Sequence, residues 1–206
     1  FDEFMIGFCG VANRINDGAV FCSGDVVLLF NPLQIDFYAR GAAAFSIKEN
    51  VETGKNHGVY LADKDGNVGM FLHKLSIEKL RELNAVDNSD NVNIYTGAMI
   101  FDSNILNDLY SLVDTAQKLS SLVNEHVRLS LYADFSYPLA SSSTLEQYYK
   151  EIPEGDFSPE LLKARKLIWD KLHKYSMKLI RFSPAAFLHF GTTQELLKLM
   201  TQEMED

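Results

Sequence analysis

The sequence predicts an α/β fold, with a mixed, mostly parallel sheet and helices on both faces. Segments typical of buried strands alternate along the chain with segments of helical periodicity, which is the pattern of a sheet covered by helices. An Asp-Gly step at Asp65-Gly66 joins two strand-like segments as an antiparallel hairpin, so both strand directions are expected. The sequence contains no repeat and no low-complexity tract, and we expect one domain over residues 1–206.

The first half of the chain predicts a helix followed mainly by strands. Apolar positions near helical spacing indicate a helix over residues 1–15, which Asp17-Gly18 ends. A second helix over residues 76–83 begins at Ser76, a residue type suited to the N-cap. The strands expected in this half lie at residues 19–25, 26–32, 42–49, on both sides of the hairpin in 58–74, and at 92–101.

The second half predicts longer helices and short strands. An amphipathic pattern indicates one long helix over residues 103–125, capped by Ser103. Ser158 and Pro159 have the types expected at the N-cap and first position of a helix over 158–175. The other expected segments are a strand running into a loop at 127–139, a loose segment or insertion at 140–157, strands at 177–184 and 185–191, and a helix at 193–200.

Composition excludes several classes of function. The net charge of −9 argues against non-specific nucleic-acid binding, although a local pocket can still attract an anionic small molecule. No stretch is long and apolar enough to predict a membrane span. Cys9 and Cys22 lie in apolar stretches without metal-binding spacing, so we expect buried free thiols and a cytoplasmic location.

Three short segments are candidates for chemistry. Asp25 follows a buried strand and a glycine, where a carboxylate at the sheet edge suits Mg²⁺; the alternative is an ordinary turn residue. His73-Lys74 ends a hairpin strand, and the lysine could pair with a phosphate or simply be solvated. Gly97, after Thr96, interrupts a strong strand, which indicates a bulge or the close approach of a ligand.

The remaining polar residues give weaker signals. The spacing of the five histidines does not predict a zinc site, and His126 and His173 are expected to be ordinary surface residues. Asp134 is a possible loop carboxylate without a defined partner. The signatures of serine hydrolases, P-loop proteins and dinucleotide-binding folds are absent from the sequence.

The quoted segments form a recognisable series when taken in order. "SGD", "NHGVYLADKDGNVGMFLHKLS", "NIYTGAMIF" and "FLHFGTTQEL" resemble the core of a sugar nucleotidyltransferase. More closely, they resemble the L-fucose-1-phosphate guanylyltransferase (GDP-L-fucose pyrophosphorylase) domain found in bifunctional fucokinases. The resemblance covers about residues 17–204. It implies a Rossmann-like nucleotidyltransferase fold and a reaction, with Mg²⁺, of L-fucose 1-phosphate and GTP to give GDP-L-fucose and pyrophosphate.

The resemblance also implies roles for individual residues. Asp25 matches the aspartate that holds the metal. Lys74 falls where related enzymes carry the lysine of a Glu-Lys-Pro step that contacts the sugar phosphate; here the step reads His-Lys-Leu. The substrate-binding residues implied on the sugar side are His57, Gly58, His73, Thr96 and Gly97.

The last segment departs from the pattern of related enzymes, which often write it Asp-x-Gly-Thr with the Asp as a second metal contact. This chain has His189, followed by Gly191 and Thr192, at a strand-to-helix junction whose free N–H groups could receive an anion. Since Mg²⁺ prefers oxygen ligands, we expect His189 to contact phosphate or sugar oxygens instead of the metal.

A second departure concerns the nucleotide. The Gly-rich basic loop that cradles the triphosphate in this family is not found in the sequence, so we expect a fragment that is incomplete as an enzyme, with a fucokinase fused to it in the full-length protein. The alternatives are a non-catalytic domain that binds sugar phosphate or supports a fucokinase, and a nucleotidyltransferase for another sugar 1-phosphate.

Overall fold

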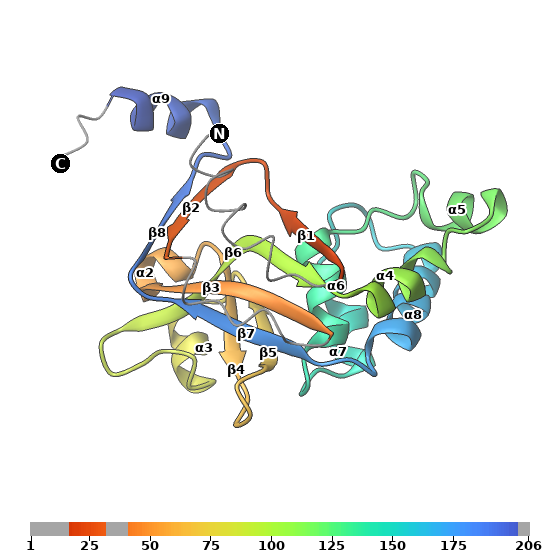
Figure 1. The fold of residues 1–206 in the computed structure, drawn as a ribbon, viewed down its shortest axis with the longest axis horizontal. Helices are drawn as coiled ribbons and strands as arrows, with labels where there is room; N and C mark the ends of the chain where they lie inside the picture. Colours follow the sequence, from red (N-terminus) through yellow and green to blue (C-terminus); the bar gives the residue numbers. More distant parts are fainter. Residues whose placement is uncertain (1–16, 32–40, 202–206) are drawn as a thin grey trace.

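A computed structural model describes residues 17–31 and 41–201 of the chain. The helix expected at residues 1–15, which includes Cys9, lies outside them. The main sheet has six strands, five of them in the order β5-β4-β6-β3-β7, with β1 added to β6 (Figure 1). Its strands are β1 (Ala19–Cys22), β3 (Ala42–Asn50), β4 (Gly58–Ala62), β5 (Val68–His73), β6 (Asn91–Phe101) and β7 (Met177–Phe182).

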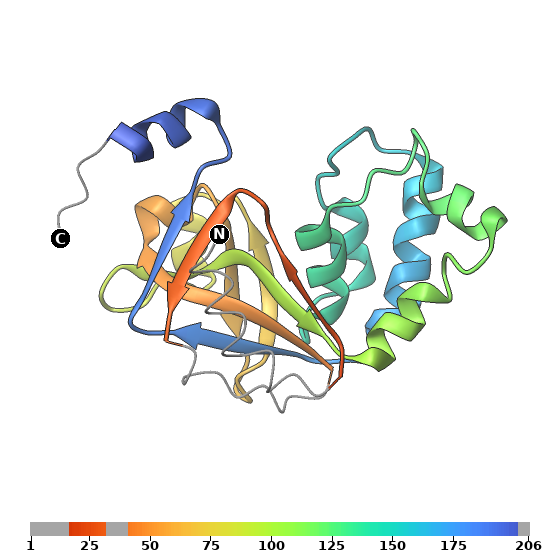
Figure 2. The same ribbon diagram turned by 45° about the horizontal axis from the view of Figure 1, so that its top comes forward.

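A separate two-stranded ribbon joins β2 (Val26–Phe30) to β8 (Ala185–His189). The ribbon is antiparallel, and its register places Val26 opposite His189. Figure 2 shows the ribbon standing beside the main sheet, so that segments from opposite ends of the described chain lie side by side.

The expected mixed sheet and α/β class are confirmed, but parallel pairing is rarer than expected. Among the described strands only β3 and β7 pair in parallel, while the β1–β6, β3–β6, β4–β5 and β4–β6 pairs are antiparallel. A parallel crossover needs a dozen or more residues, usually with a helix. The links on either side of β4 span only residues 51–57 and 63–67, and the second makes the predicted hairpin.

Helices cover both faces of the sheet, as expected. One core contains side chains of α2 (Val51–Gly54) and α3 (Ile77–Glu82) together with the β2–β8 ribbon. The other core lies under α4 (Ser103–Tyr110), α6 (Leu131–Leu139) and α8 (Pro159–Leu172). β3 supplies both cores, because successive strand residues point to opposite faces: Ala43 to the first core, Ala42 and Ala44 to the second.

Several predicted boundaries are confirmed by their caps. The Ser76 hydroxyl accepts a hydrogen bond from the Lys79 N–H at the start of α3. Ser158 caps α8 in the same way, with Pro159 at the first helical position. The last predicted helix is α9 (Thr193–Thr201).

The long helix predicted over residues 103–125 is wrong, because the chain there forms two helices. α4 begins after Asp102, whose carboxylate accepts from the Ile105 N–H, and not after Ser103. α5 (Ala116–Leu122) has its own N-cap in Thr115, whose hydroxyl accepts from the Lys118 N–H. A capping side chain in the middle of an amphipathic run therefore divides it.

The strand predicted at residues 127–139 is also wrong, because residues 131–139 form α6. Ser130 caps this helix, and buried contacts with α7 and α8 override the strand-like composition of the segment. The segment expected to be loose contains α7 (Leu145–Lys150), which begins with a reciprocal capping box between Thr144 and Gln147.

Two expectations from composition can be compared with the structure. Cys22 is a free thiol, as expected, but it is exposed instead of buried. Within residues 17–31 and 41–201, no helix is both long and apolar enough to cross a membrane.

Candidate functional site

A pocket of about 210 Å³ lies where the ends of β4 and β5 and the middle of β6 meet the β2–β8 ribbon. It brings together most of the predicted site residues from five separate segments. Its lining consists of Ser23, Asp25, Val26, Asn56, His57, Gly58, His73, Lys74, Tyr95, Gly97, Phe187 and His189.

The β4–β5 hairpin places Lys74 and His57 on the same wall. Gly58 pairs with His73 in the ladder, and the Lys74 N–H donates to the His57 carbonyl at 3.3 Å. Lys74 has φ 48°, in the left-handed region that residues other than glycine rarely adopt. Gly58 leaves no room for a side chain, because a Cβ there would lie 2.7 Å from the Phe71 ring.

Gly97 allows the end of β1 to approach β6. Its φ is 76°, and a Cβ at this position would lie 2.5 Å from the Ser23 hydroxyl oxygen. The Ser23 N–H donates to the Gly97 carbonyl at 2.7 Å. The register between β3 and β6 shifts between Ala44 and Ser46, opposite this glycine, so the expected bulge is present. The close approach at Gly97 is made by the chain itself, and it places Asp25 at the pocket.

Thr96 points away from the pocket. Its side chain is buried, and its hydroxyl donates to the Phe45 carbonyl at 2.8 Å inside the sheet. Since alternate strand residues face opposite ways, its neighbours Tyr95 and Gly97 line the pocket in its place. The structure thus gives Thr96 a place in the core.

Asp25 and His189 face each other across the end of the ribbon. The Asp25 Oδ2 and His189 Nε2 atoms are 3.4 Å apart, and both side chains are partly exposed. Gly191 lies against this pair, since a Cβ there would come within 2.9 Å of the imidazole and 3.3 Å of the carboxylate. The glycine therefore allows the chain to turn tightly over the two side chains.

Thr192 acts as a helix cap and does not line the pocket. Its hydroxyl accepts from the Glu195 N–H at 3.2 Å, and its own N–H and hydroxyl donate to the Glu195 carboxylate. This reciprocal pair occupies two of the backbone N–H groups that could receive an anion, those of Thr192 and Glu195. The capped-helix interpretation therefore accounts for Thr192.

Aromatic rings form the wall beside Asp25. The His57 ring lies edge-on to His189 and Phe187, with centroid separations of 5.5 and 5.7 Å. Burial lowers the pKa of His57 below its ordinary value, and His189 and the Lys74 cation lower it further. His57 is therefore neutral over a wider pH range than a solvated histidine.

His73 lies between this pocket and a second, smaller cavity of about 110 Å³. Its Nδ1 atom is 2.8 Å from the Glu151 carboxylate, which comes from the segment that the sequence left without structure. Asp134, expected as a loop carboxylate without a partner, is a buried residue of α6 paired with Arg165 at 2.9 Å. His126 and His173 are exposed, as expected.

The model of the fucose pyrophosphorylase domain family matches residues 1–206. The chain belongs to the fucose pyrophosphorylase family. Human fucose-1-phosphate guanylyltransferase is 24% identical over 216 residues, covering 92% of this chain and 36% of that protein. The chain thus spans about a third of the length of the curated relative it matches.

A solved structure is also similar to this fucose pyrophosphorylase domain. It is CTP:phosphocholine cytidylyltransferase from Streptococcus pneumoniae, with 12% sequence identity and a TM-score of 0.44. The similarity covers 96% of this chain and 61% of that one.

Sequence reasoning missed several lining residues of this fucose pyrophosphorylase domain. Ser23, Asn56 and Tyr95 are each one or two positions from a residue that was predicted, so the segments were found but not every member. Glu151 left no comparable signal, because it lies 78 positions from His73 in the sequence.

Chemically, the pocket combines a lysine cation, a carboxylate and neutral polar groups, which suits a phosphorylated polar ligand.

Proposed function

We propose that this domain carries the sugar-phosphate site of a guanylyltransferase that joins L-fucose 1-phosphate and GTP, releasing pyrophosphate and GDP-L-fucose. In this reaction a phosphate oxygen of the sugar attacks the α-phosphorus, and the bond to the β-phosphate breaks. The observation that carries the proposal is that Lys74 and Asp25 line one pocket in a chain of this family.

Such a transfer needs positioning and charge compensation more than a covalent intermediate. Lys74 supplies a cation at the pocket wall, where it would hold the phosphate of the sugar. The hydrogen bond from the Lys74 N–H to the His57 carbonyl fixes the backbone at this residue, so the side chain extends from a defined position. The attacking oxygen belongs to the substrate, and the domain has no need of a nucleophile of its own.

Asp25 is the proposed contact for Mg²⁺. Among the described residues, no three His, Cys, Asp or Glu side chains gather as a metal site. Asp25 nevertheless fits an ion of this kind, since Mg²⁺ commonly takes one or two carboxylates and completes its shell with water and phosphate oxygens. Bound there, it would neutralise phosphate charge.

His189 is proposed to contact oxygens of the substrate. Its Nε2 atom lies 3.4 Å from the Asp25 carboxylate, which holds the ring at the pocket edge. An imidazole is a poor ligand for Mg²⁺ compared with a carboxylate. Binding of Mg²⁺ by His189 would contradict this assignment.

Two further features are proposed on other grounds. A fused fucokinase domain is proposed from the resemblance of the sequence alone. A cytoplasmic location is proposed from the low cysteine content, together with the free thiol of Cys22.

The first experiment is a titration of the chain with L-fucose 1-phosphate in the presence of Mg²⁺. Other hexose 1-phosphates and free L-fucose serve as comparison ligands. We expect Lys74→Ala to weaken binding of L-fucose 1-phosphate by about tenfold or more, because a charge-assisted contact to phosphate is lost. Lys64→Ala, at the exposed turn of the same hairpin, is the matched control and should bind normally.

The outcomes separate the parts of the proposal. Unchanged affinity in Lys74→Ala would remove the lysine from the site. Equal binding of all hexose 1-phosphates would keep a sugar-phosphate site and remove the preference for fucose. In a longer protein with measurable activity, Asp25→Asn should abolish Mg²⁺-dependent turnover while leaving the fold intact.

A further inference from the structure

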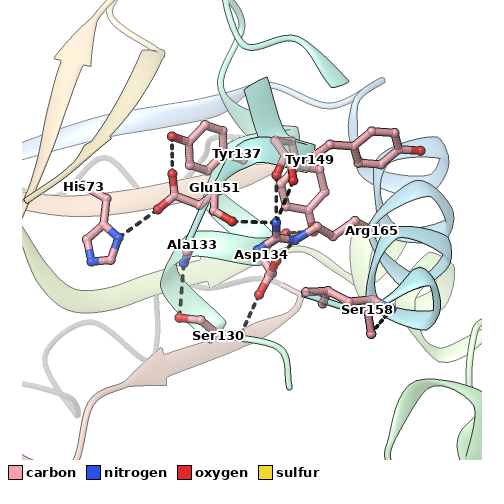
Figure 3. Close-up of polar contacts among 11 residues, drawn as sticks. His73, Ser130, Ala133, Asp134, Tyr137, Tyr149, Glu151, Ser158 and Arg165 are labelled. Carbon is pink, nitrogen blue, oxygen red and sulfur yellow. Dashed lines mark hydrogen bonds and ion pairs between the residues drawn. The ribbon is translucent and has the colours of Figure 1, made fainter. Parts of the chain in front are cut away.

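Glu151 connects the helical layer to the pocket. Its carboxylate is largely enclosed, with 11% of the side chain exposed. One carboxylate oxygen lies 2.8 Å from His73 Nδ1, and the other accepts the Tyr137 hydroxyl at 2.7 Å (Figure 3). The two neighbours approach different oxygens, so the carboxylate has a defined orientation.

The backbone of Glu151 is fixed by a buried ion pair. Its carbonyl accepts from Arg165 Nη1 at 2.8 Å, and the same nitrogen also lies 3.0 Å from the Tyr148 carbonyl. Arg165 is itself paired with Asp134, and both side chains are almost completely buried. The position of Glu151 therefore depends on the packing of α6, α7 and α8.

This geometry indicates which nitrogen of His73 carries the proton when the ring is neutral. An ionised carboxylate only accepts hydrogen bonds, so the Nδ1 atom facing Glu151 must be the donor. The second ring nitrogen, Nε2, lies on the side of the ring away from Glu151 (Figure 3). His73 also lines the pocket that contains Lys74.

We propose that Glu151 is a positioning residue that holds His73 in the Nδ1–H tautomer, so that Nε2 accepts a hydrogen bond from a sugar hydroxyl group in the pocket. The inference rests on the proposed function for the identity of the ligand. A hydroxyl is favoured over the phosphate as the partner of His73, because the Glu151 carboxylate beside the ring repels anions. Lys74, which follows His73 in the sequence, offers a cation to the phosphate.

The first test measures the tautomer and needs no ligand. The ring ¹⁵N chemical shifts of His73 are recorded at a pH where the ring is neutral, using His73→Gln to assign the signals. We expect the Nδ1–H form in the unaltered chain. In Glu151→Gln the amide can present either its oxygen or its NH₂ group, so a mixture of tautomers is expected.

The second test measures ligand affinity in the same variants. Glu151→Gln should weaken binding of L-fucose 1-phosphate by about tenfold and leave binding of inorganic phosphate unchanged. Tyr137→Phe removes one of the two groups that orient the carboxylate and should give a smaller loss of the same kind. Glu154→Gln, an exposed position three residues away, is the matched control and should change neither measurement.

Each result decides a separate part of the inference. An Nε2–H tautomer in the unaltered chain, or identical spectra in Glu151→Gln, would overturn the positioning role. Equal losses for sugar phosphate and inorganic phosphate would overturn the hydroxyl contact and favour a phosphate contact. If the unaltered chain fails to bind L-fucose 1-phosphate, the proposed function and the hydroxyl contact are overturned together, while the ring spectra still decide the role of Glu151.

Discussion

Lys74 combines the side chain proposed to bind phosphate with a strained backbone. Left-handed torsion angles cost a residue with a Cβ about 1–2 kcal/mol of free energy, and they cost glycine much less. We expect Lys74→Gly to be more stable than Lys74→Ala by about 1 kcal/mol, although both lose the cation. Urea unfolding of the two variants measures the difference, and equal stabilities would show that the backbone is relaxed in one of them.

His57 makes stability depend on pH. Its pKa is lowered from 6.5, mainly by burial, so the unfolded chain binds a proton more readily than the folded one. The contribution of the neutral ring is complete above about pH 6.5 and falls as the pH decreases toward the lower folded-state pKa. We expect His57→Gln to lose less free energy of unfolding between about pH 7.5 and about pH 5.5 than the unaltered chain.

The other histidines are present in both proteins, so the difference between the two isolates His57. Urea unfolding at the two pH values provides the measurement. A pH dependence that is the same with and without His57 would show that its ring is not desolvated in solution.

At the scale of single elements, local signals predicted some features and missed others. The hairpin at residues 58–74, α3 and α8 carry their own turn or cap, so the sequence predicted them well. α6 has the aromatic and apolar composition of a strand, and buried contacts with α7 and α8 favour the helix that Ser130 caps. Such contacts join distant segments and leave no local pattern in the sequence.

Asp102 is expected to stabilise two elements at once. One carboxylate oxygen accepts the Ile105 N–H to cap α4, and the other accepts the Gly41 N–H before β3. Asp102→Ala should therefore lower the free energy of unfolding by about 2 kcal/mol, since both hydrogen bonds are lost. Thermal or urea unfolding measures this loss.

Ser103, the cap predicted from sequence, is the control for Asp102. Its hydroxyl bonds to exposed Asp17, so Ser103→Ala should cost only a few tenths of a kcal/mol, or about 0.5 at most. A larger effect for Ser103→Ala than for Asp102→Ala would place the cap where the sequence first suggested it.

At the scale of the whole molecule, the pocket was predicted in pieces. Asp25 and Lys74 were found separately, because each was expected at the end of a strand, but their meeting depends on β1 pairing with β6. Thr96 and Gly97 were both expected to bind the ligand. Only the alternation of side chains along β6 shows that Gly97 faces the pocket and Thr96 the core. Sequence reasoning can place a residue on a strand without showing which face holds the site.

The buried Asp134–Arg165 pair is expected to hold the helical layer together. Arg165→Met would leave one oxygen of the Asp134 carboxylate and the carbonyls of Tyr148 and Glu151 without their donor, while the other Asp134 oxygen keeps the Ser130 N–H. We expect a loss of about 3 to 5 kcal/mol in the free energy of unfolding, measured in urea. Lys166→Met, next in the sequence and part of an exposed pair with Asp170, should cost about 0.5 kcal/mol or less.

Similar losses in the two variants would contradict this view of the buried pair. They would mean that the carboxylate of Asp134 is reached by water or by another donor when Arg165 is removed.

The β2–β8 ribbon has a consequence for biosynthesis. A nascent chain that has emerged from the ribosome only as far as β7 contains every strand of the main sheet, but it still lacks the partner of β2. His189 is not yet available to contact Asp25 at that stage, so the sheet can form before the wall of the pocket does. During that interval β2 presents an unpaired strand edge, which makes it suited to transient protection by a chaperone.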